Sequence, residues 1–224
     1  MPEPSGFFTS ERPTVQLPNN LQFAVATVFA TAVTISAATN ATESVCTATN
    51  TFAAGDFVEY TGGWSKATGR VFRVKAPTGT SFTLESLDTT DTNLFPAGAG
   101  VGVVRKVTTW VPITGVVSAD ISGGDGKTQE VNLLDNDMPI LLPDGFSGTS
   151  VVLTLADEPT KPHHAALKGV SDGVKLTCLR GILPGGGVLT YGGYCSFNES
   201  PSLAKGSVMS VKATFSLQNK VVRY

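Results

Sequence analysis

The sequence predicts a mainly β protein with one short flanking α-helix, and three observations support this fold class. Gly and Pro are frequent, at 24 and 13 of 224 residues, and only 15% of residues are charged, which is typical of strands joined by tight turns. Apolar and polar residues alternate between residues 205 and 218, as in a strand with one buried face. Residues 38–107 contain short strand-like runs at intervals of about ten residues, with Gly-rich turns between them.

The first expected elements lie in residues 1–37. Residues 1–15 contain prolines, Glu3 and Glu11, and lack a basic start followed by an apolar run, so we expect an N-terminal arm and no signal peptide. Residues 21–36, LQFAVATVFATAVTIS, are the most hydrophobic stretch of the chain. This stretch is too short and too rich in hydroxyl groups for a membrane helix, and its Thr, Val, Phe and Ile content predicts a strand or a pair of strands. We therefore expect no membrane span.

Residues 38–107 are expected to form a small inserted β-barrel-like module. The runs FAAGDFVEYTGGW, GRVFRVK, TSFTLESL and VGVVRKV indicate short strands, and Thr- and Ala-rich stretches flank the region. The parent domain would then consist of residues 1–37 and 108–224. A chain of this length suits one large domain that carries a smaller insertion.

The C-terminal third has the clearest pattern. Residues 149–156 predict a strand, and residues 160–173 predict the helix, with Pro162 in its first turn and Gly169 or Gly173 at its end. Three antiparallel strands are then expected in succession, joined first by the PGGG turn at 184–187. They span residues 174–183, 188–198 and 205–218, with Val174, Leu176 and Cys178 on one face of the first.

Ser202 and Lys205 form a Ser-x-x-Lys motif, in which serine acylases place an amine beside the hydroxyl nucleophile. In those enzymes the motif begins a helix, whereas here Pro201 and Gly206 bracket it and a strongly alternating strand follows. The companion Ser-x-Asn and Lys-Thr-Gly motifs do not follow downstream. We therefore interpret Ser202 and Lys205 as part of a turn that leads into a structural strand.

Two Gly-rich segments resemble nucleotide-binding loops only superficially. SGGDGKT at 122–128 lacks the first glycine of a phosphate-binding loop, because Ile121 stands at that position, and no convincing helix follows. We expect a hairpin tip there. GAGVG at 98–102 is surrounded by predicted strands and not by the strand and helix of a dinucleotide site, so we assign it no ligand.

The other polar candidates have ordinary interpretations. His163 and His164 are adjacent, so on a helix their side chains diverge and do not converge on one metal; we expect a solvated helix start. The acidic groups fall in turn-like segments without the dense Asp/Asn/Gly pattern of a calcium loop, and we expect solvated loops. These acidic residues are Asp88, Asp91, Asp135, Asp137 and Asp144.

The cysteines and the overall charge argue against a disulfide-stabilised protein, a zinc protein and a nucleic-acid-binding protein. Cys46, Cys178 and Cys195 are odd in number and widely spaced, which argues against a disulfide framework and a zinc site. We expect reduced, partly buried thiols in a chain made in a cytosol. The net charge of −2 gives no overall basic footprint for nucleic-acid binding. We expect no enzyme, no cofactor, and no catalytic, cofactor-binding or metal-binding residue.

Two segments carry a resemblance to a known family. Residues 192–224, GGYCSFNESPSLAKGSVMSVKATFSLQNKVVRY, resemble the end of the tail tube protein of long-tailed phages with flexible, non-contractile tails. Residues 52–91, from FAAGDFVEY to ESLDTTD, resemble a small β module embedded in phage structural proteins. The resemblance covers about two thirds of the chain and implies a tail-tube-type β-sandwich or barrel.

The resemblance also implies a function and partners. Six copies would form a ring, and rings would stack into a hollow tube around a tape-measure protein, with tail terminator and distal tail or baseplate proteins at its ends. DNA would pass transiently through the lumen. The arm before Val15 and the acidic loop 135–144 would be candidate ring-to-ring contacts. The alternatives are a phage decoration or receptor-binding β-sandwich, which the insertion favours, and an enzyme that rests only on Ser202 and Lys205.

Overall fold

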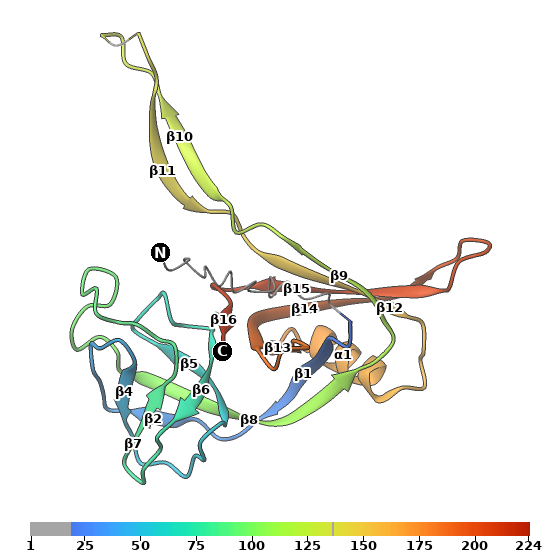
Figure 1. Cartoon of the computed structure of the whole chain (residues 1–224), viewed down its shortest axis with the longest axis horizontal. Helices are drawn as coiled ribbons and strands as arrows, with labels where there is room; N and C mark the ends of the chain where they lie inside the picture. Colours follow the sequence, from blue (N-terminus) through green and yellow to red (C-terminus); the bar gives the residue numbers. More distant parts are fainter. Residues whose placement is uncertain (1–18, 136) are drawn as a thin grey trace, which may run out of the picture.

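The structure is a computed structural model, and it describes residues 19–135 and 137–224. The expected fold class is confirmed: strands dominate, and α1 (Pro162–Asp172) is the one α-helix of the described chain. One continuous curled sheet has the strand order β3-β4-β7-β6-β5-β8-β1-β13-β14-β15-β12-β9, with β2 added on β8 and β16 on β14. Strands β10 and β11 form a separate ribbon that projects from this body (Figure 1). The predicted N-terminal arm at 1–15 lies outside the described residues.

The first part of the sheet curls around an aromatic core. Trp64, Tyr60 and Phe82 are fully buried there, and the polar ends of the first two are satisfied, because the indole N–H of Trp64 donates to the Pro96 carbonyl and the Tyr60 hydroxyl to that of Gly100. The strands are β2 (Val33–Ile35), β3 (Ala37–Ala38), β4 (Ser44–Thr47), β5 (Phe57–Gly62), β6 (Val71–Lys75), β7 (Ser81–Leu84) and β8 (Gly102–Ile113).

The second part of the sheet folds over α1. Leu167 and Val170 of α1 are buried with Leu153 and Phe215 in a second core, and the antiparallel pairing of β13, β14 and β15 confirms the three successive strands expected from the sequence. The strands are β1 (Gln22–Phe29), β9 (Val116–Ser122), β12 (Ser150–Ala156), β13 (Leu176–Ile182), β14 (Val188–Ser202), β15 (Ser210–Leu217) and β16 (Val222–Arg223).

Strand β13 is covered on both faces, which the pattern of apolar and polar residues in the sequence did not show. Cys178 points into a small third core with Ala26 and Val107, while Leu179, the next residue, points into the second core. The expectation that Val174 shares one strand face with Leu176 and Cys178 is wrong. Val174 precedes the strand, has a positive φ of 44° and is exposed, because the chain turns there out of α1.

Residues 21–36 form the expected pair of strands, β1 and β2, and both pair with β8. No helix in the described part of the chain is long and apolar enough to cross a membrane. The predicted domain boundaries fall inside continuous strands: 37/38 within β3 and 107/108 within β8. The division into a parent domain and an inserted module stays a prediction.

The two larger cores are joined at a polar and aromatic junction. The Arg180 guanidinium lies 4.4 Å from the centre of the Trp110 ring, and Arg105 pairs with the buried carboxylate of Glu59. Burial raises the pKa of Glu59 against the opposing effect of Arg105. From the C-terminal segment, Val222 enters the first core, and the Tyr224 hydroxyl accepts a hydrogen bond from the Arg73 backbone N–H.

Candidate functional site

The sheet portion β14-β15-β12-β9 presents one exposed face and two strand edges that are not fully paired. Neighbouring strands in it are all antiparallel. Strand β9 is paired on one side only, with β12, and forms one free edge. At the other end, β13 pairs with β14 only as far as Tyr194, so the distal half of β14 is paired with β15 alone. Free edges of this kind are ready to pair with another chain.

One face of this sheet portion is lined by hydroxyl and amide groups, and we call it the hydroxyl face. The cross-strand register places Ser150 between Ser122 and Ser216, and Thr154 between Ser118 and Lys212. Asp120 and Lys212 carry the only charges within the set. The hydroxyl face consists of Ser118, Asp120, Ser122, Ser150, Val152, Thr154, Ser210, Lys212, Thr214, Ser216, Tyr194, Ser196 and Asn198.

The opposite face is buried except at β9. Val151 of β12 is 1% exposed, yet Ile121, its partner on β9 and on the same face, is 60% exposed. Ala119, the partner of the buried Leu153, is exposed as well. Val116, at the start of β9, packs against the second core, but the described chain leaves the same face uncovered at Ala119 and Ile121. The unpaired edge beside Ile121 offers backbone groups to which another chain can pair, and such pairing would also cover this side chain.

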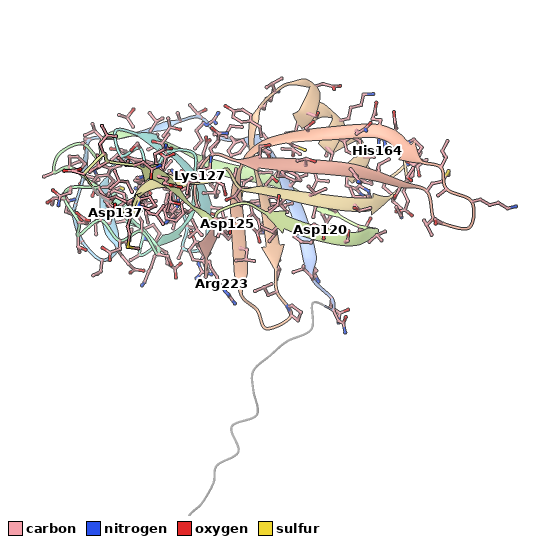
Figure 2. The ribbon with its side chains drawn as sticks, turned by 90° about the horizontal axis from the view of Figure 1, so that it is seen from above. Asp120, Asp125, Lys127, Asp137, His164 and Arg223 are labelled. Carbon is pink, nitrogen blue, oxygen red and sulfur yellow. The ribbon has the colours of Figure 1, made fainter. Side chains whose placement is uncertain are left out.

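The ribbon of β10 (Gly126–Val131) and β11 (Ile140–Phe146), with the loop between them, is called the arm here. It prolongs β9 and β12 beyond the body, and Figure 2 follows it through Asp125, Lys127 and Asp137. Residues 123–146 contain five acidic side chains and one basic one, a net charge of −4. Nearly every residue of the arm is exposed, including Leu134, Leu141 and Leu142.

The arm begins at a glycine pair. Gly123 and Gly124 have φ values of +83° and +85°, and a Cβ at Gly123 would lie 2.0 Å from the Gly148 carbonyl oxygen. The expected hairpin tip at 122–128 is therefore wrong. The chain crosses from β9 to β10 there, and the hairpin closes later, between β10 and β11, because these segments can pair with each other. A two-stranded ribbon is marginally stable alone, which suits a segment that packs on another chain.

A second projection closes β14 and β15 at residues 203–209. Ser202 is the last residue of β14 and pairs with Ser210, while Lys205 lies in the exposed turn. The turn predicted around this motif is confirmed for Lys205, whereas Ser202 belongs to the strand. Asp135 lies in the exposed tip of the arm and Asp144 in β11. Asp88 accepts hydrogen bonds from Thr90 within a loop, as expected for a turn residue.

The histidines differ from the expected solvated pair. His163 is 2% exposed, Thr114 Oγ1 lies 3.3 Å from its Nδ1, and burial lowers its pKa, so this interpretation was wrong. Adjacency in the sequence hid the fact that α1 turns His163 inward. His164 instead meets the edge of the Phe197 ring. Among the described residues, no group of three or more His, Cys, Asp or Glu side chains converges on a metal position.

The three cysteines are unpaired and buried. Burial raises the pKa of Cys46 and of Cys195 to about 12, which removes the thiolate form needed for nucleophilic chemistry at neutral pH. A small hollow of about 170 Å³ lies between β1, β8, β13 and the end of α1. It is lined by Ala26, Thr27, Phe29, Arg105, Val170, Lys175, Leu176 and Thr177.

Exposed sheet edges, an uncovered apolar strand face and a projecting arm are features of a protein that binds copies of itself or related chains. The sequence profile of a family described as phage tail tube protein matches residues 62–224, which is more than half of the chain. The chain belongs to the phage tail tube protein family. It is thus a structural tail protein of a phage-type particle, and the expected family and virion location are confirmed.

Other comparisons give distant similarity. A chain from a structure titled "Virion of native gene transfer agent (GTA) particle" is 13% identical with a TM-score of 0.40, over 51% of this chain and 88% of that one. A chain from "Cryo-EM structure of the anti-feeding prophage (AFP) baseplate, 6-fold symmetrised" is 12% identical with a TM-score of 0.36, over 53% and 85%. No curated protein matches the sequence.

Proposed function

We propose that this tail tube family member forms six-membered rings that stack into a hollow tail tube, and that DNA passes through its lumen. The observation that carries the proposal is the pair of free edges on β9 and distal β14, at opposite ends of one antiparallel sheet portion. Joining these edges between neighbours would satisfy their open backbone groups, apart from the Phe197 N–H that Ser171 Oγ already accepts, and would close six sheets into one barrel.

Strand direction supports this closure. Four alternating strands make β9 antiparallel to β14 within the chain. A rotation about an axis along the strands leaves their direction unchanged, so β9 of one copy would meet β14 of the next as an antiparallel neighbour. Pro201 lies near the end of distal β14, where a residue without an N–H group is tolerated on an edge.

The hydroxyl face would line the lumen. It contributes one aspartate and one lysine per copy, so their charges balance, and hydroxyl groups dominate the rest. Tight phosphate binding needs clustered cationic side chains, and a surface without them lets DNA slide. The core-side face, with α1, would then point outward, and the region 38–107 would lie outside the barrel as an inserted module.

The arm would contact the adjacent ring. The arm extends along the direction of β9 and β12, past the end of the sheet portion β14-β15-β12-β9. It exposes apolar and acidic side chains along its length. The part of the chain that follows the arm, residues 147–224, has four acidic and eight basic side chains. Its net charge of +4 complements the net charge of −4 of the arm. The segment before Val15 would be a second ring-to-ring contact.

The proposed tube would enclose a tape-measure protein and would join tail terminator and distal tail or baseplate proteins at its ends. The role is structural and not enzymatic, and the chain would be made in the cytoplasm of a bacterial host. Buried thiols and the exposed turn around Lys205 agree with this role.

Ring closure is tested by charging the uncovered strand face. Ile121→Lys should leave the fold intact, because the side chain is already exposed, but it should convert rings and tubes into monomers. Thr92→Lys, on an exposed loop of the first sheet portion, is the matched control and should assemble normally. Light scattering with circular dichroism measures both effects. Assembly of Ile121→Lys at the wild-type concentration would reject closure through β9.

A further inference from the structure

At Ala119 and Ile121 the core-side face of β9 is exposed, although the same face of the neighbouring strand β12 is buried. Ile121 lies level with Val151 on the same face, yet the first is 60% exposed and the second 1%. Ala119, the partner of the buried Leu153, is exposed on this face too, whereas Val116 at the start of β9 packs on the second core. Covering such side chains is favourable because it removes apolar surface from water.

The free edge of β14 carries a structure that can supply this cover. Helix α1 lies against it: Ser171 Oγ accepts a hydrogen bond from the Phe197 backbone N–H at 3.0 Å, and the rings of His164 and Phe197 meet edge to face. Lys168 of α1 forms an ion pair with Glu199 of β14. Phe197 remains only partly buried by these contacts.

The core-side face of β9 and helix α1 both lie on the outer side of the ring when copies are placed around a tube axis. Rotation about that axis keeps the core-side face outward in every copy. Helix α1 packs on this outward face, through Leu167 and Val170, and Ile121 points to it as well. In the proposed ring, the outward side of β9 would therefore face α1 of the next copy and not the lumen.

We propose that α1 and the distal half of β14 of one copy form the docking surface for the core-side face of β9 of the next copy. This inference rests on the proposed ring. The helix then has two roles, since it closes the core of its own chain with Leu167 and Val170, and its exposed side at Ala165 completes the core of a neighbour. The contact is heterologous, with different surfaces on each partner, as closed rings require.

A charge-exchange cycle tests the contact. Ile121→Glu and Ala165→Arg both replace exposed residues, so each variant should keep the wild-type circular dichroism and melting temperature. Each alone should raise the protein concentration at which rings form by about tenfold or more, because a charge is placed against an apolar partner. The double variant should restore assembly to within about threefold of wild type. Lys175→Gln, an exposed residue in the segment that follows α1, is the control for charge changes near α1 outside the contact.

The outcomes separate the docking surface from the ring itself. Rings from wild type, with no rescue in the double variant, would overturn the docking surface and leave the ring in place. A second readout mixes Ile121→Cys and Ala165→Cys chains under mild oxidation. We expect covalent dimers when the two variants are mixed, and no covalent dimers when either variant is oxidised alone. If wild type forms no ring and the mixture no dimer, both the ring and the docking surface are rejected.

Discussion

Replacing Tyr224 tests how the C-terminal segment stabilises the junction between the two main cores. In the wild type the Tyr224 hydroxyl accepts a hydrogen bond from the backbone N–H of Arg73, with 2.7 Å between oxygen and nitrogen. The Arg73 guanidinium lies 4.6 Å from the centre of the Tyr224 ring. Tyr224→Phe keeps the ring and leaves this part-buried N–H without its acceptor, which costs about 1–2 kcal/mol of unfolding free energy. Tyr224→Ala also removes the ring contacts with Arg73 and Phe57, for a total of about 3–4 kcal/mol.

Urea unfolding followed by fluorescence measures this difference. With a denaturant slope of about 2 kcal/mol per molar, the phenylalanine variant should unfold about 0.5–1 M urea earlier than wild type, at an unchanged slope. Arg223→Gln changes an exposed neighbour of the same segment and should shift the midpoint little. A Tyr224→Phe midpoint equal to that of wild type would refute the hydrogen bond as a source of stability.

Three further predictions follow from buried groups, the arm and the hydroxyl face. Burial raises the pKa of Tyr60 to about 12, above its value of about 10 in the unfolded chain. The stability that the neutral Tyr60 side chain contributes is therefore complete below pH 10 and is lost as the pH rises through 12. Tyr60→Phe should lessen this alkaline loss of stability, measured as melting temperatures from pH 9 to 12. Gly123→Val should disturb the base of the arm and increase protease cleavage between residues 122 and 148, while Gly126→Val, with open space around it, should not; equal cleavage would reject the strained base. Thr214→Arg should make tubes retain double-stranded DNA at low salt and release it at high salt, unlike Thr214→Gln; DNA retention by neither or by both variants would reject the lumen assignment.

Strands with one wet face were predictable from the sequence. The alternation in 205–218 gives the buried Val211, Ala213 and Phe215 of β15, because each side chain there meets either the core or water. The turn at 184–187 and the helix near Pro162 were also predictable, since Gly and Pro act locally. Family membership followed from the same C-terminal segment.

Features that depend on distant partners were not predictable. His163 is buried because Thr114, far away in the sequence, lies against α1, and Cys178 and Leu179 are both buried because β13 has cores on both sides. The arm was mistaken for a loop because its pairing, Glu130 with Leu141 among others, buries nothing that alternation could reveal. Exposure of Ile121 is invisible in the sequence, since its apolar character predicts burial.

The most direct test of the central claim is negative-stain electron microscopy of the purified full chain, with mass by light scattering on the same sample. The account predicts six-membered rings and hollow tubes, and their loss in Ile121→Lys but not in Thr92→Lys. Folded monomers at every concentration, or a closed dimer or trimer without a lumen, would contradict it.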